Sequence, residues 1–360
     1  QTVPISAEQL IPADGTCIEF DRLEMQGNQT IDEWDLEVIE APFVGKCITP
    51  TLAASVLGAT TNYYLERGFI TTRTYLPNQD LSRGVMRVVA SEGRVQSTVV
   101  DARKPIYLPN VTIGDDDNAL SIRDLEQTVD QLNTVPGNDV KLELLPGDAP
   151  GETQVVLKND GKPGISGRLA ADNTGSKSTG RNGASVSLQI GDLVGQNEVI
   201  SLYYRENIDG ARDGELTKNS HSSAASVSFP DGYNTYKIGF SKGDFATSLV
   251  FPTTNTILDN VGSNISHYAE ADRVFFRDQR SKHSIKAKLK KDSVESYIGG
   301  QRIDVSSRSL KALELSSNHV WGFGDKVLIV NPEIAIGLDE VNTLPAGVNT
   351  PVENPQAEYL

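Results

Sequence analysis

The sequence predicts α+β modules followed by an all-β antiparallel transmembrane β-barrel. Before Gly161, apolar residues recur at helical spacing in two separate blocks. After Gly161, apolar and polar side chains alternate, which is typical of strands with two different faces. The alternating segments are roughly 10 residues long and separated by turn residues, as in membrane barrels. No run approaches the ~20 apolar residues that a membrane helix needs, so a helical membrane protein is excluded.

The charge distribution supports the same boundary. Residues 1–160 carry 12 basic and 25 acidic side chains, a net charge of −13, whereas residues 161–360 carry 21 and 23, a net charge of −2. An acidic first half argues against a nucleic-acid partner. Residues 1–15 are expected to form a lead-in, and Gln1-Thr2-Val3-Pro4 has the form of a processed N-terminus.

The two cysteines of the chain are Cys17 and Cys47. Their spacing fits no common metal motif. A disulfide closing this ~30-residue loop would contribute about 3–4 kcal/mol on the chain-entropy estimate, and it would require an oxidising compartment such as the periplasm. Two buried free thiols are the alternative.

The first module is expected to begin with a strand over residues 17–23. Thr30 and Glu33 have the spacing of a capping box, which predicts a helix with Trp34 and Val38 on one side. A second helix is expected to follow, with strands over residues 69–76 and 85–90 completing the order β-α-α-β-β. This second helix would start after Pro50, end at Gly68 and carry an apolar stripe of Leu52, Val56, Ala59 and Tyr63.

The second module is expected to begin with a strand over residues 106–113. Ser121 and Asp124 predict the start of a helix. Two strands, at 140–145 and 154–157, would flank a loop rich in proline and glycine. The apolar residues of the helix are Leu125, Val129 and Leu132.

Alternation in the last 200 residues is clearest from Ile285 to Lys290. Short turns are expected at 230–232 and 322–325, and long polar loops at 206–219 and 252–264, an asymmetry typical of outer-membrane barrels. A soluble β-sandwich has the same alternation and is the alternative. Aromatic residues near the expected strand ends favour the barrel: Tyr203, Phe229, Tyr233, Phe251, Phe275, Phe276, Trp321 and Phe323.

Specific motifs then add a family resemblance. Residues 121–127 (Ser-Ile-Arg-Asp-Leu-Glu-Gln) and 144–152 (Leu-Leu-Pro-Gly-Asp-Ala-Pro-Gly-Glu) resemble the second POTRA module of two-partner secretion transporters. Residues 172–180 (Asp-Asn-Thr-Gly-Ser-Lys-Ser-Thr-Gly) look like the family's first barrel hairpin. Residues 64–73 (Tyr-Leu-Glu-Arg-Gly-Phe-Ile-Thr-Thr-Arg), with the two cysteines, look like its first POTRA module. The resemblance covers essentially the whole chain after about Gly15.

The resemblance implies an outer-membrane protein with periplasmic POTRA modules. POTRA 1 would comprise residues 16–101, POTRA 2 residues 102–160, and the N-terminal part of the barrel residues 161–360. The family barrel has 16 strands, and we count nine or ten here, so a C-terminally truncated chain is expected. The family's plug helix and its late-loop Val-Arg-Gly-Tyr-like motif have no match in this sequence.

No residue pattern predicts an active site, so an enzyme is not expected. The four histidines, His221, His267, His283 and His319, lie on separate expected strands without local metal-ligand spacing. The expected catalytic residues, metal ligands and cofactors are therefore none. Neither a nucleotide nor a nucleic acid is expected as a partner.

Two sets of residues are candidates for transport. Lys286, Lys288 and Lys290 would line the lumen. They would either bias a polar channel towards anions or an extended polypeptide, or be neutralised by carboxylates such as Asp272. In the POTRA fold the second strand lies at a sheet edge, where an extended client can add a strand; the alternative is that these edges pair with the neighbouring module or the barrel. The expected edge residues are Ile70, Thr72, Thr74 and Leu76 in POTRA 1, and Val140, Leu142 and Leu144 in POTRA 2.

The expected function is export of an unfolded exoprotein across the outer membrane by two-partner secretion, with activation of that partner as a further role. The partners would be a large secreted protein of the haemolysin, adhesin or contact-dependent toxin type, together with outer-membrane lipid and lipopolysaccharide. A barrel-assembly protein of the same superfamily is one alternative. A soluble binding protein built on a β-sandwich is the other.

Overall fold

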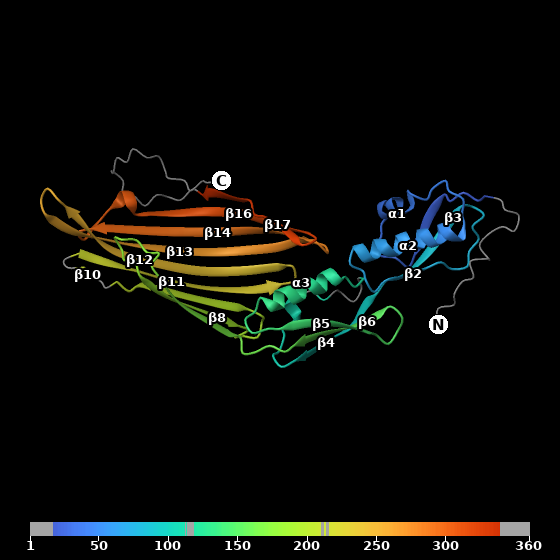
Figure 1. The fold of residues 1–360 in the computed structure, drawn as a ribbon, viewed down its shortest axis with the longest axis horizontal. Helices are drawn as coiled ribbons and strands as arrows, with labels where there is room; N and C mark the ends of the chain where they lie inside the picture. The colour runs from blue at the N-terminus through green and yellow to red at the C-terminus, as the bar shows by residue number, and fades with distance from the viewer. Residues whose placement is uncertain (1–16, 112, 114–118, 210–211, 214–215, 339–360) are drawn as a thin grey trace. The chain divides into compact units, whose positions relative to one another are not determined.

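A computed structural model describes residues 17–111, 113, 119–209, 212–213 and 216–338. Two small three-stranded sheets with helices precede one large, mainly antiparallel sheet (Figure 1). The chain forms two compact units, and segments 102–111 and 130–140 belong to the same unit as the large sheet. The expected lead-in over residues 1–15 lies outside the described residues. Within the described ranges, no helix is long and apolar enough to cross a membrane.

The first module has the expected order β-α-α-β-β. In its sheet, β3 lies between β1, which is parallel to it, and β2, which is antiparallel. Val56 of the second helix and Met86 and Val88 of β3 belong to one buried apolar core. The elements are β1 (Arg22–Gln26), α1 (Glu33–Glu40), α2 (Pro50–Glu66), β2 (Arg73–Tyr75) and β3 (Val85–Ser91).

The start of helix α1 differs from the prediction. Asp32, not Thr30, is the N-cap, because its carboxylate accepts from the backbone N–H of Asp35 at 2.9 Å and the Asp35 carboxylate accepts from the N–H of Asp32 at 3.1 Å. The predicted apolar side is also wrong: Trp34 is 64% exposed, and Asp35 and Ile39 are the buried residues of the helix.

A buried carboxylate takes the backbone N–H that a capping box at Thr30 would need. Glu92 accepts from the backbone N–H groups of Gln29 and Thr30 at 3.0 and 3.1 Å, and from the Tyr64 hydroxyl at 2.9 Å. Burial, together with the hydrogen bond to Glu92, raises the pKa of Tyr64 above its usual range. These bonds tie the segment before α1 to α2 and to the end of β3.

The second module begins with a strand that the sequence analysis missed. Strand β4 pairs with β6 in the order β4-β6-β5, so residues 94–101, which we assigned to the first module, contribute to the second sheet. The expected strand at 106–113 is wrong, because this segment includes a short 3₁₀ helix, η2. The elements are β4 (Arg94–Ala102), η2 (Leu108–Asn110), α3 (Ile122–Asn133), β5 (Val140–Pro146) and β6 (Glu152–Asn159).

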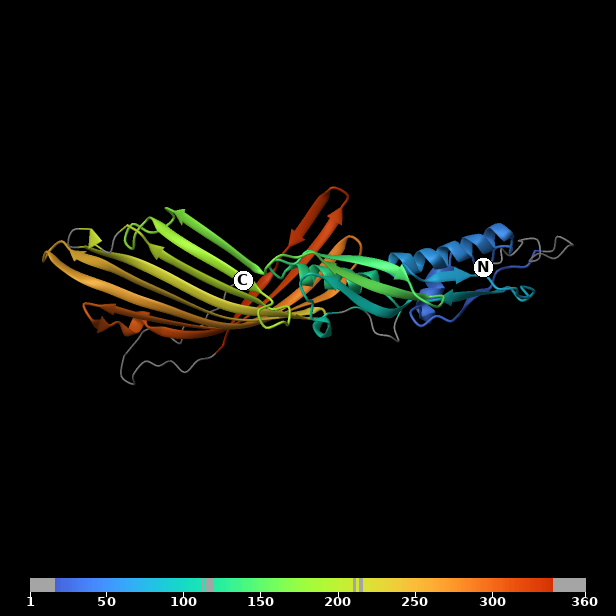
Figure 2. The same cartoon turned by 90° about the horizontal axis from the view of Figure 1, so that it is seen from below.

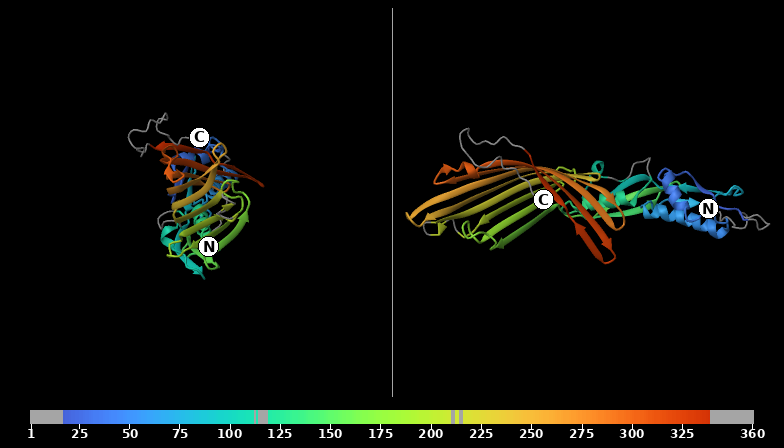
Figure 3. Two further views of the ribbon diagram at one scale, coloured as in Figure 1. Left: turned by 90° about the vertical axis from the view of Figure 1, so that its left-hand side faces the viewer. Right: turned by 90° about the horizontal axis from the view of Figure 1, so that it is seen from above.

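The large sheet is a run of sequential antiparallel strands (Figures 2 and 3). Its path is β7-β8-β9-β11-β12-β13-β14-β16-β17, nine strands within the described residues, in line with the nine or ten expected. Strands β17 and β18 pair with different parts of β16 and so follow one another along one edge. The elements are β7 (Ile165–Asp172), β8 (Gly183–Gly191), β9 (Val199–Asn207), β10 (Arg212–Asp213), β11 (Leu216–Asp231), β12 (Asn234–Phe251), β13 (Thr256–Arg277), β14 (Ser281–Ile298), β15 (Gln301–Arg302), η3 (Asp304–Ser306), β16 (Arg308–Phe323), β17 (Lys326–Val330) and β18 (Glu333–Leu338).

The large sheet corrects two interpretations of the sequence, the alternative β-sandwich and the expected long loops. All these strands join one sheet, so the β-sandwich is wrong. The long loop expected at 252–264 is largely strand, because Phe251 pairs with Thr256 and leaves only a tight turn between β12 and β13. Of the loop expected at 206–219, the described residues 206–207, 212–213 and 216–219 are also strand. The reason is that polar residues beyond the apolar part of a hairpin still form its backbone ladder. Strand β13 thus reaches 22 residues, about twice what a tilted strand needs to cross a membrane.

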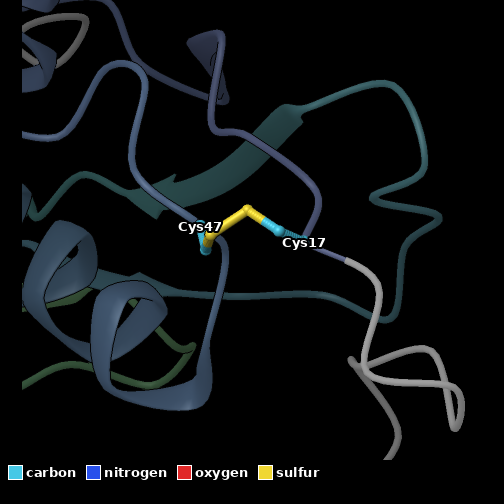
Figure 4. Close-up of a disulfide and its surroundings, with 2 residues drawn as sticks. All are labelled: Cys17 and Cys47. Carbon is cyan, nitrogen blue, oxygen red and sulfur yellow. A yellow bond between two sulfur atoms is a disulfide. The ribbon is translucent and has the colours of Figure 1, made fainter.

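The predicted disulfide between Cys17 and Cys47 is confirmed (Figure 4). Their Cα atoms are 5.2 Å apart, and the neighbouring Glu19 forms an isolated β-bridge with Cys47. This bridge replaces the expected strand at 17–23, since β1 begins only at Arg22. The bond therefore fixes the chain ahead of β1 to the start of α2.

Loss of this disulfide is expected to loosen the first module selectively. On the chain-entropy estimate, Cys47→Ser removes about 3–4 kcal/mol of stability. Hydrogen exchange should therefore become faster in α2 and β3 and stay unchanged in β11 to β14. Free alkylation of both thiols in protein kept under oxidising conditions would contradict the bond.

Candidate functional site

The strand register separates the large sheet into an apolar and a polar face. Leu289 of β14 lies opposite Ala269 on one side and Leu313 on the other. One residue earlier, Lys288 lies opposite Glu270 and Glu314. Because side chains alternate across a strand, these two rows occupy opposite faces. The apolar row continues through cross-strand partners over the sheet: Ile165, Ile190, Ile200, Val227, Ile238, Ala269, Leu289, Leu313 and Ile336.

The three lysines predicted to line a lumen lie together on the polar face, and each has a carboxylate partner. Lys286 lies 3.3 Å from Glu270 and 3.9 Å from Asp272. Lys288 contacts Glu314 at 2.6 Å, and Lys290 contacts Asp292 at 2.8 Å. Each lysine is thus neutralised by a carboxylate, as the second alternative expects, while the lining of a lumen by these residues stays a prediction.

Two histidines that looked unrelated in the sequence are brought together. His283 and His319 are register partners on β14 and β16, with their Nδ1 atoms 3.2 Å apart. Trp321 stacks on His319 and Phe276 on His283, near the short turns of the sheet. Among the described residues, no group of three or more His, Cys, Asp or Glu side chains could hold a metal ion. The cluster instead has the composition of an interfacial aromatic girdle.

In the first module, β2 is an edge strand of its sheet, but it is shorter than predicted. Of the predicted residues, only Thr74 lies within it, and its hydroxyl is 2.5 Å from that of Thr61 on α2. Ile70 lies before the strand and is 37% exposed, whereas Thr72 is buried and its N–H donates to the carbonyl of Phe69. The fourth residue, Leu76, follows the strand and packs against the core.

In the second module, β5 is an edge strand along the whole predicted segment. Val140 is buried, and Leu142 and Leu144 pack against the core of the module. These three side chains face inward, so what the edge offers is its backbone N–H and C=O groups. Client binding at either edge stays a prediction.

The C-terminal end of α3 is bonded to two turns of the large sheet. Asp130 lies 2.6 Å from Arg277 and 3.3 Å from Lys282, which flank the β13–β14 turn. Gln131 donates to the carbonyl of Asn234 after the β11–β12 turn, at 3.1 Å. Burial opposes ionisation of Asp130, but the hydrogen bond and charge of Arg277, with the charge of Lys282, lower its pKa below the usual value.

The segment around η2 is bonded to a third turn. Asn197, in the β8–β9 turn, is buried with φ +58°, and its side chain binds the carbonyl of Tyr107 at 2.7 Å and its N–H at 3.2 Å. The side chain of Asn110 donates to the carbonyl of Gln196 at 2.6 Å, and the backbone carbonyl of Asn110 accepts from the N–H of Gly232 at 3.0 Å. We call these bonds, together with those of Asp130 and Gln131, the rim contacts.

Sequence reasoning missed the rim contacts. Asp130 and Arg277 are 147 residues apart and sit on a helix and a turn that carry no shared motif. The contacts join segments 102–111 and 130–140 to three turns of the sheet, all within one compact unit.

Comparison with known proteins gives a consistent result. Residues 151–359 match the family described as haemolysin secretion/activation protein ShlB/FhaC/HecB. Residues 18–93 match a POTRA domain of the ShlB type, and residues 94–146 match a POTRA domain. The start of the second match agrees with the position of β4.

The relatives are transporters. The chain is 27% identical over 344 residues to the outer membrane transporter CdiB of Escherichia coli O6:K15:H31, covering 94% of this chain and 57% of that protein. It is 23% identical to the haemolysin transporter protein ShlB of Serratia marcescens, covering 92% and 58%. The chain thus spans a little over half the length of these relatives.

Solved structures agree with the fold. A structure of CdiB from Escherichia coli superposes with a TM-score of 0.79 at 25% identity, covering 93% of this chain and 62% of that one. CdiB from Acinetobacter baumannii gives a TM-score of 0.75 at 18% identity over 93% and 65%. An outer-membrane barrel with periplasmic POTRA modules, as the sequence predicts, fits these names and folds.

The two faces predict that arginine impairs membrane insertion at one position and is tolerated at the adjacent one. Leu289→Arg places a charge on the apolar face and should cost about 2–4 kcal/mol if the site lies near the membrane midplane. Lys288→Arg keeps a cation on the polar face and should insert normally. Folded yield in the outer membrane measures both, and equal losses would mean that the register is wrong by one residue.

The rim contacts predict a local effect of Asp130→Asn. Since the contact is partly exposed, exchange of backbone amides at the end of α3 and in the β13–β14 turn should rise by about two- to five-fold. Because the pKa of Asp130 is lowered in the folded state, its contribution is present above the ordinary carboxyl pKa of about 4 and is lost at lower pH.

Asp124→Asn removes the same charge from the opposite, N-terminal end of the same helix, so it serves as the control. An equal response from both variants, measured by hydrogen exchange, would contradict the contact.

Proposed function

Because the chain belongs to the haemolysin secretion/activation protein family ShlB/FhaC/HecB, we propose that it acts in an outer-membrane transporter that exports a large unfolded protein. One observation carries the proposal: two modules with open sheet edges are joined to a sheet with one apolar and one polar face. Such a chain can hold an extended polypeptide in the periplasm and offer it a polar path through lipid. Its role is transport rather than catalysis.

Client capture is proposed at the edges of β2 and β5. An extended polypeptide would pair with their unpaired backbone groups and so extend the sheet. Strand β5 offers the longer edge, seven residues against three for β2. The inward packing of Leu142 and Leu144 favours recognition through the backbone, which suits a client that has not folded and that varies in sequence.

The polar face is proposed as the wall of the transport path. Lys286, Lys288 and Lys290 with their carboxylate partners would present balanced charge to the passing chain. A wall of this kind neither attracts nor repels acidic or basic segments strongly. A pore for long polypeptides needs such weak interactions, because every segment of the client must pass. No nucleotide is required, since folding of the client outside the cell can bias its movement.

The proposed partner is a large exoprotein of the haemolysin, adhesin or contact-dependent toxin type, which the transporter also activates. The support is that the relatives are named CdiB and haemolysin transporters. A barrel-assembly role would make folded outer-membrane proteins, rather than a secreted protein, dependent on the chain.

Site-specific photo-crosslinking tests client capture. A photoreactive residue at Glu143 on β5 or at Tyr75 on β2 is expected to cross-link to the unfolded N-terminal segment of the secreted protein encoded beside the transporter. Val99 on β4, at the opposite edge of the second sheet, is the matched control, being similarly exposed.

Cross-linking from Glu143 and Tyr75 but not from Val99 would support client capture at the edges of β2 and β5. Equal cross-linking to an unrelated unfolded polypeptide would reject specific recognition. Loss of other barrels from the outer membrane on deletion of the gene, with secretion intact, would favour the barrel-assembly role.

A further inference from the structure

The apolar face of the large sheet contains a hollow of about 860 Å³. Ala225 and Ala269 line it, and their short side chains leave room between larger neighbours. Its volume is in the range of small-molecule sites, about 300–1,000 Å³. The larger apolar walls are Ile200, Val227, Ile238, Phe240 and Leu289.

Basic side chains line one end of this hollow. Lys291 of β14 lies directly opposite both Lys311 of β16 and His267 of β13, and all three line the hollow. They share the face of Leu289, two residues from Lys291, rather than that of Lys290. Two ammonium groups at the end of an apolar hollow complement a ligand that joins a phosphate to hydrocarbon chains.

The depth of these lysines can be estimated along the strands. Lys291 is eight residues from His283, and Lys311 is ten residues from Trp321, in the ring cluster near the short turns. At about 3.3 Å per residue and a tilt of about 45°, these separations correspond to roughly 19 and 23 Å across the membrane. An apolar band is about 25 Å tall. The lysines therefore lie close to the boundary opposite the turns that make the rim contacts.

We propose that the hollow binds lipopolysaccharide of the outer leaflet. Its acyl chains would lie against Ile238 and Phe240, and a phosphate would lie between Lys291 and Lys311. The inference rests on the proposed function, because the barrel must be inserted with its short turns towards the periplasm. A glycerophospholipid of the inner leaflet would carry its phosphate at the other boundary, which is why the depth favours lipopolysaccharide.

Native mass spectrometry of the full-length protein in detergent, titrated with purified lipopolysaccharide, tests the proposal. The double variant K291Q/K311Q should bind at least about tenfold more weakly, and K291R/K311R should retain binding because the charge is kept. Ala269→Trp fills the hollow without changing the charge and should also weaken binding. Lys286→Gln, on the polar face of the same strand and outside the lining of the hollow, is the matched control and should bind normally.

Three outcomes would overturn the site: K291Q/K311Q binding like the unchanged protein, Lys286→Gln losing binding equally, or phosphatidylglycerol binding as tightly as lipopolysaccharide. Secretion of the client is measured separately. Loss of lipopolysaccharide binding with secretion intact, or the reverse, distinguishes this site from the transport function.

Discussion

The two-residue period of side chains along paired strands is the constraint on which the large sheet depends. Lys288 meets Glu270 and Glu314, and its neighbour Leu289 meets Ala269 and Leu313. A slip of one residue between any two strands would put a charged row where the apolar row should be. In lipid, a strand must also satisfy every backbone group through its neighbours. The long ladders of β11 to β14 meet both demands, since each added pair makes a slip more costly.

One local irregularity adjusts this pattern where the sheet leaves the membrane. The register of β13 against β14 shifts between Val274 and Phe276, which leaves an extra residue on β13. As a result Phe276, rather than Phe275, is the partner of His283. A bulge of this kind bends and twists a strand. Here it lies near the end of the hairpin, close to the stacked rings and to Arg277 of the rim contacts.

The sequence predicted the features that depend on local period and failed where distant groups decide. Alternation from Ile285 to Lys290, the helix around Leu125 and the cysteine pair all needed only neighbouring residues or one short loop. The capping box was misplaced because Glu92, far along the chain, takes the N–H of Thr30. Strand β4 was missed because its pairing partner, β6, comes some 50 residues later. The rim contacts had no local signal, since Asp130 and Arg277 meet only through the fold.

The rim contacts lie close in the chain to the first residue of β5, Val140, which belongs to the same compact unit as the large sheet. The Asn133 side chain donates to the carbonyl of Val140 at 3.0 Å and accepts from its N–H at 2.7 Å, so the first residue of β5 is tied to the end of α3. Asp130, one turn earlier, reaches Arg277. These bonds form a continuous set from the start of β5 to the β13–β14 turn, all within that unit. Each bond is weak when partly exposed, but the attachment consists of bonds to three separate turns. Removing one bond should then soften the attachment without releasing it.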